Sequence, residues 1–296
     1  MKVNRVRQNV FPVLAAMIWG MAFVAQSVGA EHVEPFTFNA VRALVASLFL
    51  LGLCGVMHLL RKRSGTPSVT RSRKDMLIGG VCCGLALSVA TNLQQKGLET
   101  TTSGKAGFIT ALYIVIVPIL GLLFGKKAPK IIWISLALAV AGLYCLCINE
   151  DFAITGGDVY IMLCALAFAI HILIIDHFTQ VVDGVELSCI QFMTVCVVST
   201  IGMLLTETPA WADIQSCMGA ILYVVIFSSG VAYTLQILAQ KDSNPTVVCL
   251  LLSLESVFAT LSGAWILGDQ MSGKEYFGCV LMLAAVVLAQ LPEKKS

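Results

Sequence analysis

Long apolar runs, separated by short polar or charged segments, occupy most of this 296-residue sequence. The run from Asn9 to Gly29 is typical, because it has about the 20 residues that an α-helix needs to cross the hydrocarbon core of a bilayer. A helix inside lipid bonds all of its own backbone polar groups, so repeated runs of this kind predict helices and no sheet. Charged residues make up only 12% of the chain, against roughly 25% in soluble domains. We therefore predict an all-α integral membrane protein.

Ten of these runs predict ten transmembrane helices. Their ranges are 9–29, 35–59, 76–95, 104–124, 131–148, 158–176, 187–205, 218–239, 246–267 and 276–291. Most of the 19 Lys and Arg residues lie in alternate connections, above all in residues 61–74, or near the two ends of the chain. Positively charged connections stay on the cytoplasmic side of a membrane, so we expect both termini to be cytoplasmic. The predicted location is the plasma membrane, which the chain crosses many times.

The third predicted helix carries a polar stripe in an otherwise apolar run. Its members lie at positions i, i+3, i+4 and i+7, which share one face of a helix: Ser88, Thr91, Asn92 and Gln95. A similar set lies 141 positions beyond Ser88, Asn92 and Gln95: Ser229, Tyr233 and Gln236. One stripe in each half predicts two halves that face a shared polar cavity. The alternative is that these small and amide side chains hold helices together, as they often do in membranes.

Other residue pairs favour an internal repeat. Arg42 pairs with Gln191 and Trp19-Gly20 with Phe168-Ala169 at a separation of 149, and Gly125-Lys126 pairs with Gly268-Asp269 at 143. Because five helices per half is an odd number, the second half must start from the opposite side of the membrane. The sequence therefore predicts two inverted five-helix repeats, residues 1–150 and 151–296, an architecture common among secondary transporters. Chance similarity between apolar segments is the alternative.

Several motifs occur in a characteristic order along the chain. They are Trp19-Gly20 in the first helix, Arg42 in the second, GLETTTSGKAGFITALYIVIVPILG over residues 97–121, SLESVFATLSGAWILGDQ over residues 253–270, and Gly278 in the tenth helix. In their order and spacing, these motifs resemble the EamA-type branch of the drug/metabolite transporter superfamily. The resemblance implies a secondary carrier, often an exporter of amino acids or other metabolites, with a substrate cavity between its two halves.

The chain departs from this family's pattern at three places. The family's usual Gly-Glu reads Gly125-Lys126 after the fourth helix and Gly268-Asp269 after the ninth, and its common Glu-Pro reads Glu255-Ser256. The resemblance therefore assigns no role to these acidic or proline positions, and it does not fix the substrate.

Ionisable residues inside the predicted helices are candidates for function, because a charge within a bilayer is costly. Glu255 lies about 13 Å into its helix, and we interpret it as a substrate-binding or proton-coupling carboxyl; the alternative is a hydrogen-bonded structural Glu. Arg42 and Lys105 are candidate anion contacts, unless their long side chains extend to the membrane surface. His171 is a candidate for substrate binding or proton relay, or a buried structural His. Pro118 predicts a kink in the fourth helix.

The candidate cavity combines aromatic side chains with a few polar groups, as small-molecule sites do. Its predicted residues are Trp19, Asn92, Gln95, Tyr113, His171, Ser229, Tyr233, Gln236 and Glu255. Gly104-Lys105 precedes Ala106 and lacks the pattern of a phosphate-binding loop, so no ATP-driven motor is indicated. The 11 cysteines lie mostly in apolar runs without zinc-ligand spacing, so we predict no metal, no other cofactor and no catalytic residue.

We therefore predict a secondary transporter that exports small metabolites, amino acids or related compounds, by alternating access through a central cavity. The expected partners are a small-molecule substrate and the lipid bilayer; a net charge of +2 indicates no nucleic-acid partner, and the oligomeric state stays open. The alternatives are an integral-membrane enzyme or a flippase for a lipid-linked substrate, and a structural helper or receptor. An enzyme would need ionisable residues clustered at one membrane face, whereas those of this chain are scattered, so we predict that the protein is not an enzyme.

Overall fold

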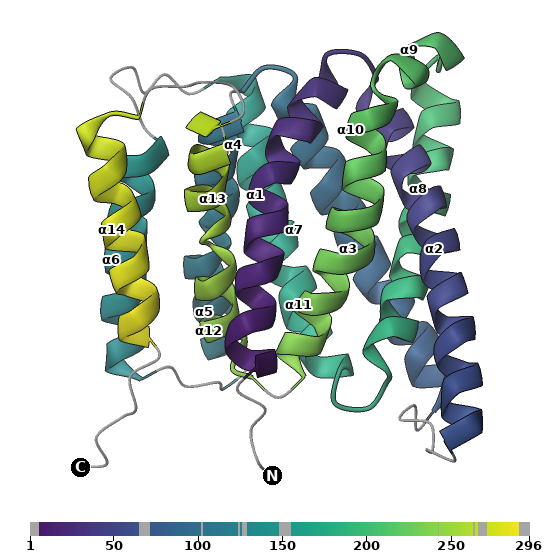
Figure 1. Cartoon of the computed structure of the whole chain (residues 1–296), viewed down its shortest axis with the longest axis horizontal. Coiled ribbons are helices and arrows are strands. Elements are labelled where there is room, and N and C mark those ends of the chain that lie inside the picture. Colours follow the sequence, from purple (N-terminus) through teal and green to yellow (C-terminus); the bar gives the residue numbers. More distant parts are fainter. Residues whose placement is uncertain are drawn as a thin grey trace.

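The computed structural model describes residues 6–64, 72–101, 103–123, 125, 129–147, 155–241, 243–262, 264–265 and 271–289. Every regular element within these ranges is a helix (Figure 1). The helices, of which η1 and η2 have the wider π geometry, are η1 (Val6–Val10), α1 (Phe11–Ala30), α2 (Pro35–Ser64), α3 (Arg73–Leu98), α4 (Ser103–Ala111), α5 (Tyr113–Leu123), α6 (Lys130–Cys147), α7 (Gly156–Phe178), α8 (Gly184–Thr206), α9 (Trp211–Ser216), α10 (Met218–Tyr223), η2 (Val224–Ala232), α11 (Tyr233–Gln240), α12 (Pro245–Leu252), α13 (Glu255–Ser262) and α14 (Gly273–Ala289).

Within the described part of the chain, eight helical segments are long and apolar enough to cross a membrane. They are Arg7–Ala30, Pro35–Ser64, Arg73–Leu98, Lys105–Leu123, Gly156–Phe178, Gly184–Thr206, Met218–Gln240 and Pro245–Ser262. Lys130–Leu146 forms a shorter apolar helix. The prediction of a helical protein that crosses a membrane several times is confirmed; the count of ten crossings stays a prediction.

Polar side chains fix where several helices begin. The Thr155 hydroxyl accepts a hydrogen bond from the Asp158 backbone N–H, and the Asp158 carboxylate accepts one in return from the Thr155 N–H, at 2.7 Å. This reciprocal cap satisfies two N–H groups at the start of α7. Asp183 caps α8 by accepting from Val185 N at 3.0 Å. Short polar connections therefore set the helix starts at both ends of the bundle.

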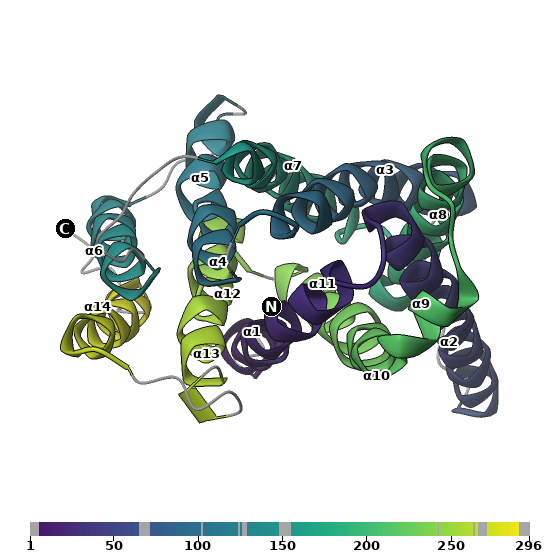
Figure 2. The same ribbon diagram turned by 90° about the horizontal axis from the view of Figure 1, so that it is seen from above.

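Two antiparallel helix pairs stand at opposite edges of the bundle, α6 with α14 and α2 with α8 (Figures 1 and 2). Gly142 and Gly278 let α6 and α14 approach closely, since a Cβ on Gly278 would lie 2.7 Å from the Gly142 carbonyl oxygen. Small residues serve in this way at membrane helix contacts, where packing rather than the hydrophobic effect holds helices together. The backbone contact therefore fixes the position of α14 against α6.

The pair α2 and α8 is fastened at both ends. At one end, the Glu207 carboxylate accepts hydrogen bonds from Phe36 N at 2.8 Å, Thr37 N at 2.6 Å and the Thr37 hydroxyl at 2.7 Å. A carboxylate is favourable there because the first N–H groups of a helix carry partial positive charge. At the other end, Arg61 donates to Asp183 at 2.6 Å. We therefore expect α2 and α8 to move together.

Two helices that the sequence predicts as continuous are interrupted. The segment predicted over residues 104–124 breaks at Leu112 into α4 and α5, and the segment over 246–267 breaks at Ser253 and Leu254 into α12 and α13. At both places a backbone N–H bonds the carbonyl three residues earlier, not four as in an α-helix. Leu112 N donates to Ile109 O at 3.2 Å, and Leu254 N donates to Leu251 O at 3.3 Å. Pro118 lies inside α5, where it removes the helix bond to the Ile114 carbonyl, and not at the first break. Because of the two breaks, Tyr113 and Glu255 each begin a new helix.

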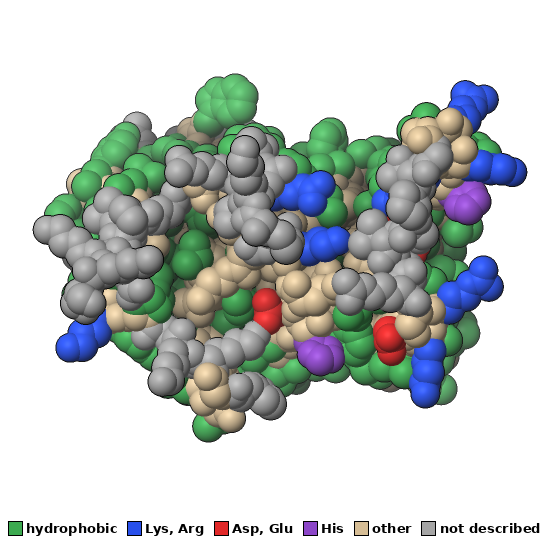
Figure 3. All heavy atoms as spheres, turned by 90° about the horizontal axis from the view of Figure 1, so that it is seen from below, with side chains coloured by type: hydrophobic (Ala, Val, Ile, Leu, Met, Phe, Trp, Pro, Cys, Tyr) green, Lys and Arg blue, Asp and Glu red, His purple; other side chains and the backbone are tan. Residues whose placement is uncertain are grey.

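The first turn of α1 and the last turn of α14 lie at the same end of the bundle, the lower end in Figure 1. Several Lys and Arg side chains are exposed on this face (Figure 3). The last turn of α2, which lies at the same end of the bundle (Figure 1), contains Arg61, Lys62 and Arg63. This arrangement agrees with the charge pattern of the sequence, although the cytoplasmic side stays a prediction. Lys126, Gly268 and Asp269, which the repeat pairing used, lie outside the described residues.

Candidate functional site

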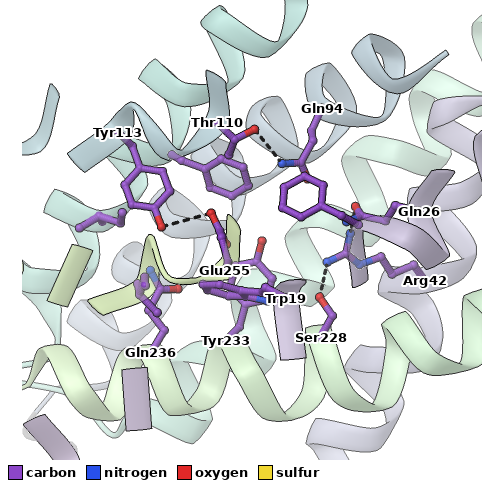
Figure 4. A pocket seen from close by; sticks show the side chains of 14 residues that line it. Trp19, Gln26, Arg42, Gln94, Thr110, Tyr113, Ser228, Tyr233, Gln236 and Glu255 are labelled. Carbon is purple, nitrogen blue, oxygen red and sulfur yellow. Dashed lines mark hydrogen bonds between the residues drawn. The ribbon is translucent and has the colours of Figure 1, made fainter. Parts of the chain in front are cut away.

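A cavity lies in the middle of the bundle, with about 460 Å³ of space not filled by atoms, part of it open to solvent (Figure 4). Helices from both halves of the chain line it, with the residues Trp19, Phe23, Gln26, Arg42, Gln94, Thr110, Tyr113, Phe168, Ile172, Ser228, Tyr233, Gln236, Leu252 and Glu255.

Arg42 is the cation of this cavity. Its side chain is turned inward from α2, and only 3% of the residue is exposed. Nε donates to Ser229 Oγ at 2.7 Å, Nη2 to Ser228 Oγ at 3.3 Å and Nη1 to Gln26 Oε1 at 3.4 Å. All three acceptors are neutral, and a guanidinium has five N–H donors, so these bonds do not exhaust it. The alternative that Arg42 extends to the membrane surface is wrong, because hydroxyl groups of η2 and an amide of α1 hold it inside.

Glu255 is the acid of the same cavity and is 4% exposed. It begins α13, and its Oε1 accepts a hydrogen bond from Tyr113 Oη at 3.4 Å. Figure 4 shows Glu255 and Arg42 reaching the cavity from different sides. In the described part of the structure, neither of them takes part in an ion pair. A basic and an acidic side chain are therefore buried in one cavity without an ion pair between them.

Further polar groups surround the carboxyl side of the cavity. Gln94 Nε2 donates to the Thr110 hydroxyl at 3.3 Å. Gln236 is buried, and its Oε1 has no hydrogen-bond partner among the described residues. A buried carbonyl without a partner costs free energy, on the order of 1–3 kcal/mol. Gln236 therefore offers an acceptor to any donor that enters near Glu255.

Aromatic rings form another part of the wall. The Trp19 and Tyr233 rings meet edge to face, with centroids 4.8 Å apart. Phe192, which is not a lining residue, packs against Tyr233 from behind at 5.4 Å. Gly20 lets α1 approach α13 closely, because a Cβ there would lie 2.6 Å from Phe258 Cβ and 2.7 Å from the Glu255 carbonyl oxygen. The position of Trp19 and the start of α13 therefore depend on one close helix contact.

The lining residues come in pairs with constant separations along the chain. The pairs are Trp19 with Phe168 and Phe23 with Ile172, 149 positions apart, and Gln94 with Gln236, Thr110 with Leu252 and Tyr113 with Glu255, 142 positions apart. The separation of 149 is the one that the sequence shows for the first and sixth predicted helices. Gln94 and Gln236 come from the third and eighth predicted helices. Their separation of 142 differs by one from the separation of 141 between the two stripes, which pairs Gln95 with Gln236.

Several predicted site residues lie at the cavity. Trp19, Tyr113, Tyr233, Gln236, Glu255 and the candidate anion contact Arg42 all line it. Ser229 is buried directly behind the lining, where it accepts the bond from Arg42 Nε.

Other predicted site residues lie at helix contacts instead. Asn92 Nδ2 donates to Ser199 Oγ at 3.0 Å, and Gln95 Nε2 donates to the Gln26 carbonyl at 3.0 Å. In the first stripe, these bonds fit the alternative that polar side chains hold helices together. Neither residue is part of the cavity lining given above.

His171 and Lys105 are engaged outside the lining as well. His171 is fully buried, with Nε2 3.1 Å from Gln191 Oε1 and its ring 6.2 Å from that of Tyr233. Lys105 forms an ion pair with the buried carboxylate of Asp158, so an internal acid occupies the predicted anion contact. Lys105 is therefore drawn toward α7 rather than out to the membrane surface.

Sequence reasoning missed the lining residues Phe23, Gln26, Gln94, Thr110, Phe168, Ile172, Ser228 and Leu252. A signal for two of them was present: Phe23 and Gln26 follow Trp19 at i+4 and i+7, on the same helix face. Gln94 differs by one position, about 100° of helix rotation, from the predicted Gln95. In the described part of the chain, no three His, Cys, Asp or Glu side chains come together as metal ligands.

Comparison with known families identifies the fold and the class of protein. The model of the EamA-like transporter family matches residues 8–148 and, separately, residues 155–291. The chain belongs to this family. The resemblance seen in the motifs is thereby confirmed. Membership of the EamA-like transporter family points to a membrane transporter rather than an enzyme.

Relatives of the chain carry transporter names. A protein of Archaeoglobus fulgidus named as an uncharacterized transporter is 29% identical, over 98% of this chain and 87% of the relative. The inner membrane transporter YedA of Escherichia coli K12, also named as uncharacterized, is 24% identical over 93% of this chain and 88% of its own length. A protein of known crystal structure superposes with a TM-score of 0.78 over 96% of each chain, at 16% identity, and shares the fold.

Proposed function

We propose that this protein is a secondary carrier for zwitterionic metabolites, amino acids or close relatives, and that its net direction is export across the plasma membrane. The observation that carries the proposal is that a basic and an acidic side chain, Arg42 and Glu255, lie in one cavity without an ion pair between them. An amino acid carries a carboxylate and an ammonium group. The carboxylate would bind the guanidinium of Arg42, and the ammonium would bind Glu255 and the unpartnered oxygen of Gln236.

The physical reason is the cost of burying charge. Moving an ion out of water costs on the order of several kcal/mol even after the protein relaxes. The neutral partners of Arg42 and the single phenol on Glu255 recover only part of that cost. A ligand that brings one charge of each sign to the cavity recovers more of it. A purely cationic or anionic ligand would satisfy one residue and leave the other uncompensated.

Transport by alternating access is supported by relations between the two halves. Five pairs of equivalent positions line the cavity, and the family model matches each half once. Helix packing also repeats between the halves. By the separations given above, α7 corresponds to α1 and η2 corresponds to part of α3. In the first case α3 packs against α7, and in the second η2 packs against α1. We propose two inverted five-helix repeats, residues 1–150 and 151–296, with ten crossings once α6 and α14 are counted. The cavity lies between them, where inverted-repeat transporters bind substrate.

Glu255 also offers a means of coupling. An acid inside a membrane protein is a candidate proton carrier, and we propose that Glu255 holds either the substrate ammonium or a proton, but not both. Exchange of the two at one site would couple export of an amino acid to proton entry.

The test is counterflow in proteoliposomes with matched sets of three compounds. One set is leucine, its decarboxylated amine 3-methylbutylamine and its deaminated acid 4-methylpentanoate, and equivalent sets cover the other amino acids. We expect at least one amino acid to exchange while its amine and its acid do not. Exchange of the amine or the acid as fast as the amino acid would refute zwitterion recognition. A chemically modified product without flux would support the enzyme alternative.

A further inference from the structure

A second hollow, separate from the central cavity, opens at the side of the bundle near its upper end. It encloses about 1,060 Å³, including its open part, and lies among α2, α3, α7 and α8. Its residues are Glu34, Pro35, Phe36, Ser88, Val89, Asn92, Leu93, Lys96, Tyr160, Val198, Thr206 and Glu207. We call it the lateral groove. None of these residues lines the central cavity.

The lateral groove has a charged rim and an apolar wall. Three polar side chains lie at the rim: Glu34, just before α2; Lys96, near the end of α3; and Tyr160 of α7, an exposed residue that carries a hydroxyl group. From Lys96 down to Ser88 the groove follows α3 for about 12 Å. Val89 in this wall is 53% exposed. The groove therefore runs from a polar edge along an apolar stretch of α3 toward the middle of that helix.

We propose that the lateral groove binds one phospholipid whose headgroup joins a primary ammonium to a phosphate, as in phosphatidylethanolamine. The opposite charges of the rim carry the argument. Lys96 already forms an ion pair with Glu99 at 2.7 Å, but an ammonium has three donors and this pair uses one. Lys96 and the Tyr160 hydroxyl would bind the phosphate, and Glu34 would accept from the lipid ammonium. One acyl chain would cover Val89 and Leu93.

This arrangement also predicts which lipids bind poorly. Phosphatidylcholine has a quaternary ammonium without N–H groups, so it cannot donate a hydrogen bond to Glu34. Phosphatidylglycerol has no cation, so the negative charge of its phosphate would face Glu34 and Glu207 without compensation. The Glu207 carboxylate is already engaged by three donors of α2 and is not needed for the lipid.

Native mass spectrometry of the full-length protein tests the proposal with the three lipids at equal concentration and with identical acyl chains. We expect phosphatidylethanolamine to be retained in preference. Glu34→Gln and Lys96→Gln should each lower its ratio to phosphatidylcholine about two- to fivefold, the range of one exposed ion pair. Lys274→Gln, at the opposite edge of the bundle, is the matched control and should leave the ratio unchanged.

Val89→Trp provides a second test, because a bulky ring would fill the apolar wall and reduce the bound lipid without altering the rim. Equal retention of the three lipids would overturn the proposal. So would a preference that survives Glu34→Gln and Lys96→Gln. Detection of a dimer that is absent in Val89→Trp would also overturn the proposal, because it would show that a second copy of the chain occupies the groove. These readouts measure lipid rather than flux, so they stand apart from the transport proposal.

Discussion

Replacing Arg42 by Met tests the zwitterion site at its cation. The guanidinium donates to three neutral oxygens, from Ser228, Ser229 and Gln26, and retains donors for a carboxylate. A hydrogen bond to a charged group contributes about 1.5–3 kcal/mol, which corresponds to roughly a 10- to 150-fold change in Kd. Arg42→Met should raise the Kd of the amino acid by this factor without raising that of its decarboxylated amine, which loses only a like charge.

The assay is equilibrium binding to purified protein, with the amino acid identified by counterflow and its amine measured side by side. Arg42→Lys keeps the charge but loses the planar fork, so its effect should be intermediate. Arg63→Met, at an exposed position in the last turn of α2, is the matched control and should bind both compounds as the wild type does. An equal loss of affinity for amine and amino acid in Arg42→Met would refute the reasoning, because it would assign Arg42 a purely structural role.

Three further predictions concern charge and packing. Glu255→Gln should slow amino-acid counterflow about 10- to 100-fold and flatten its pH dependence; an unchanged rate and pH profile would remove its proposed role. Gly20→Ala should destabilise the protein by about 1–3 kcal/mol, which a lower Tm in detergent would show. Gly52→Ala is the control and should not lower the Tm, because nothing lies within 4 Å of the added Cβ. Equal Tm values for the two variants would contradict the close contact of α1 with α13. Glu207→Ala should lower the free energy of unfolding by about 2 kcal/mol. Asp213→Ala, at an exposed position, is the control and should change it by less than about 0.5 kcal/mol. An equal loss in both variants would contradict the role of Glu207 at the start of α2.

The membrane class and the helices could be predicted from sequence because lipid leaves the chain few choices. Apolar length and the positions of Lys and Arg report directly on crossings and orientation. The breaks at Leu112 and at Ser253–Leu254 could not be predicted this way, since neither site holds the Gly or Pro that usually marks an interruption. These breaks are seen only in the folded structure, where α4 packs against α7 and α13 against α1.

The cavity was harder to predict, because periodicity assigns a residue to a helix face but does not say which neighbour that face meets. The polar stripe of α3 illustrates this limit. Its Asn92 and Gln95 bond neighbouring helices, whereas Gln94, one position away, reaches the cavity. Glu255 was easier to identify, because a carboxyl in the middle of an apolar run is conspicuous without any knowledge of its neighbours.

The central claim is that substrate occupies the cavity between the two halves and reaches it from each side in turn. The most direct measurement uses Ser228→Cys, a change of one atom in the buried lining, in a background without the native cysteines. A membrane-impermeant thiol reagent is applied to intact cells and to inside-out vesicles. The account predicts modification from both sides, and protection by the transported amino acid in each case. Modification from one side only, or a rate that the amino acid does not change, would contradict it.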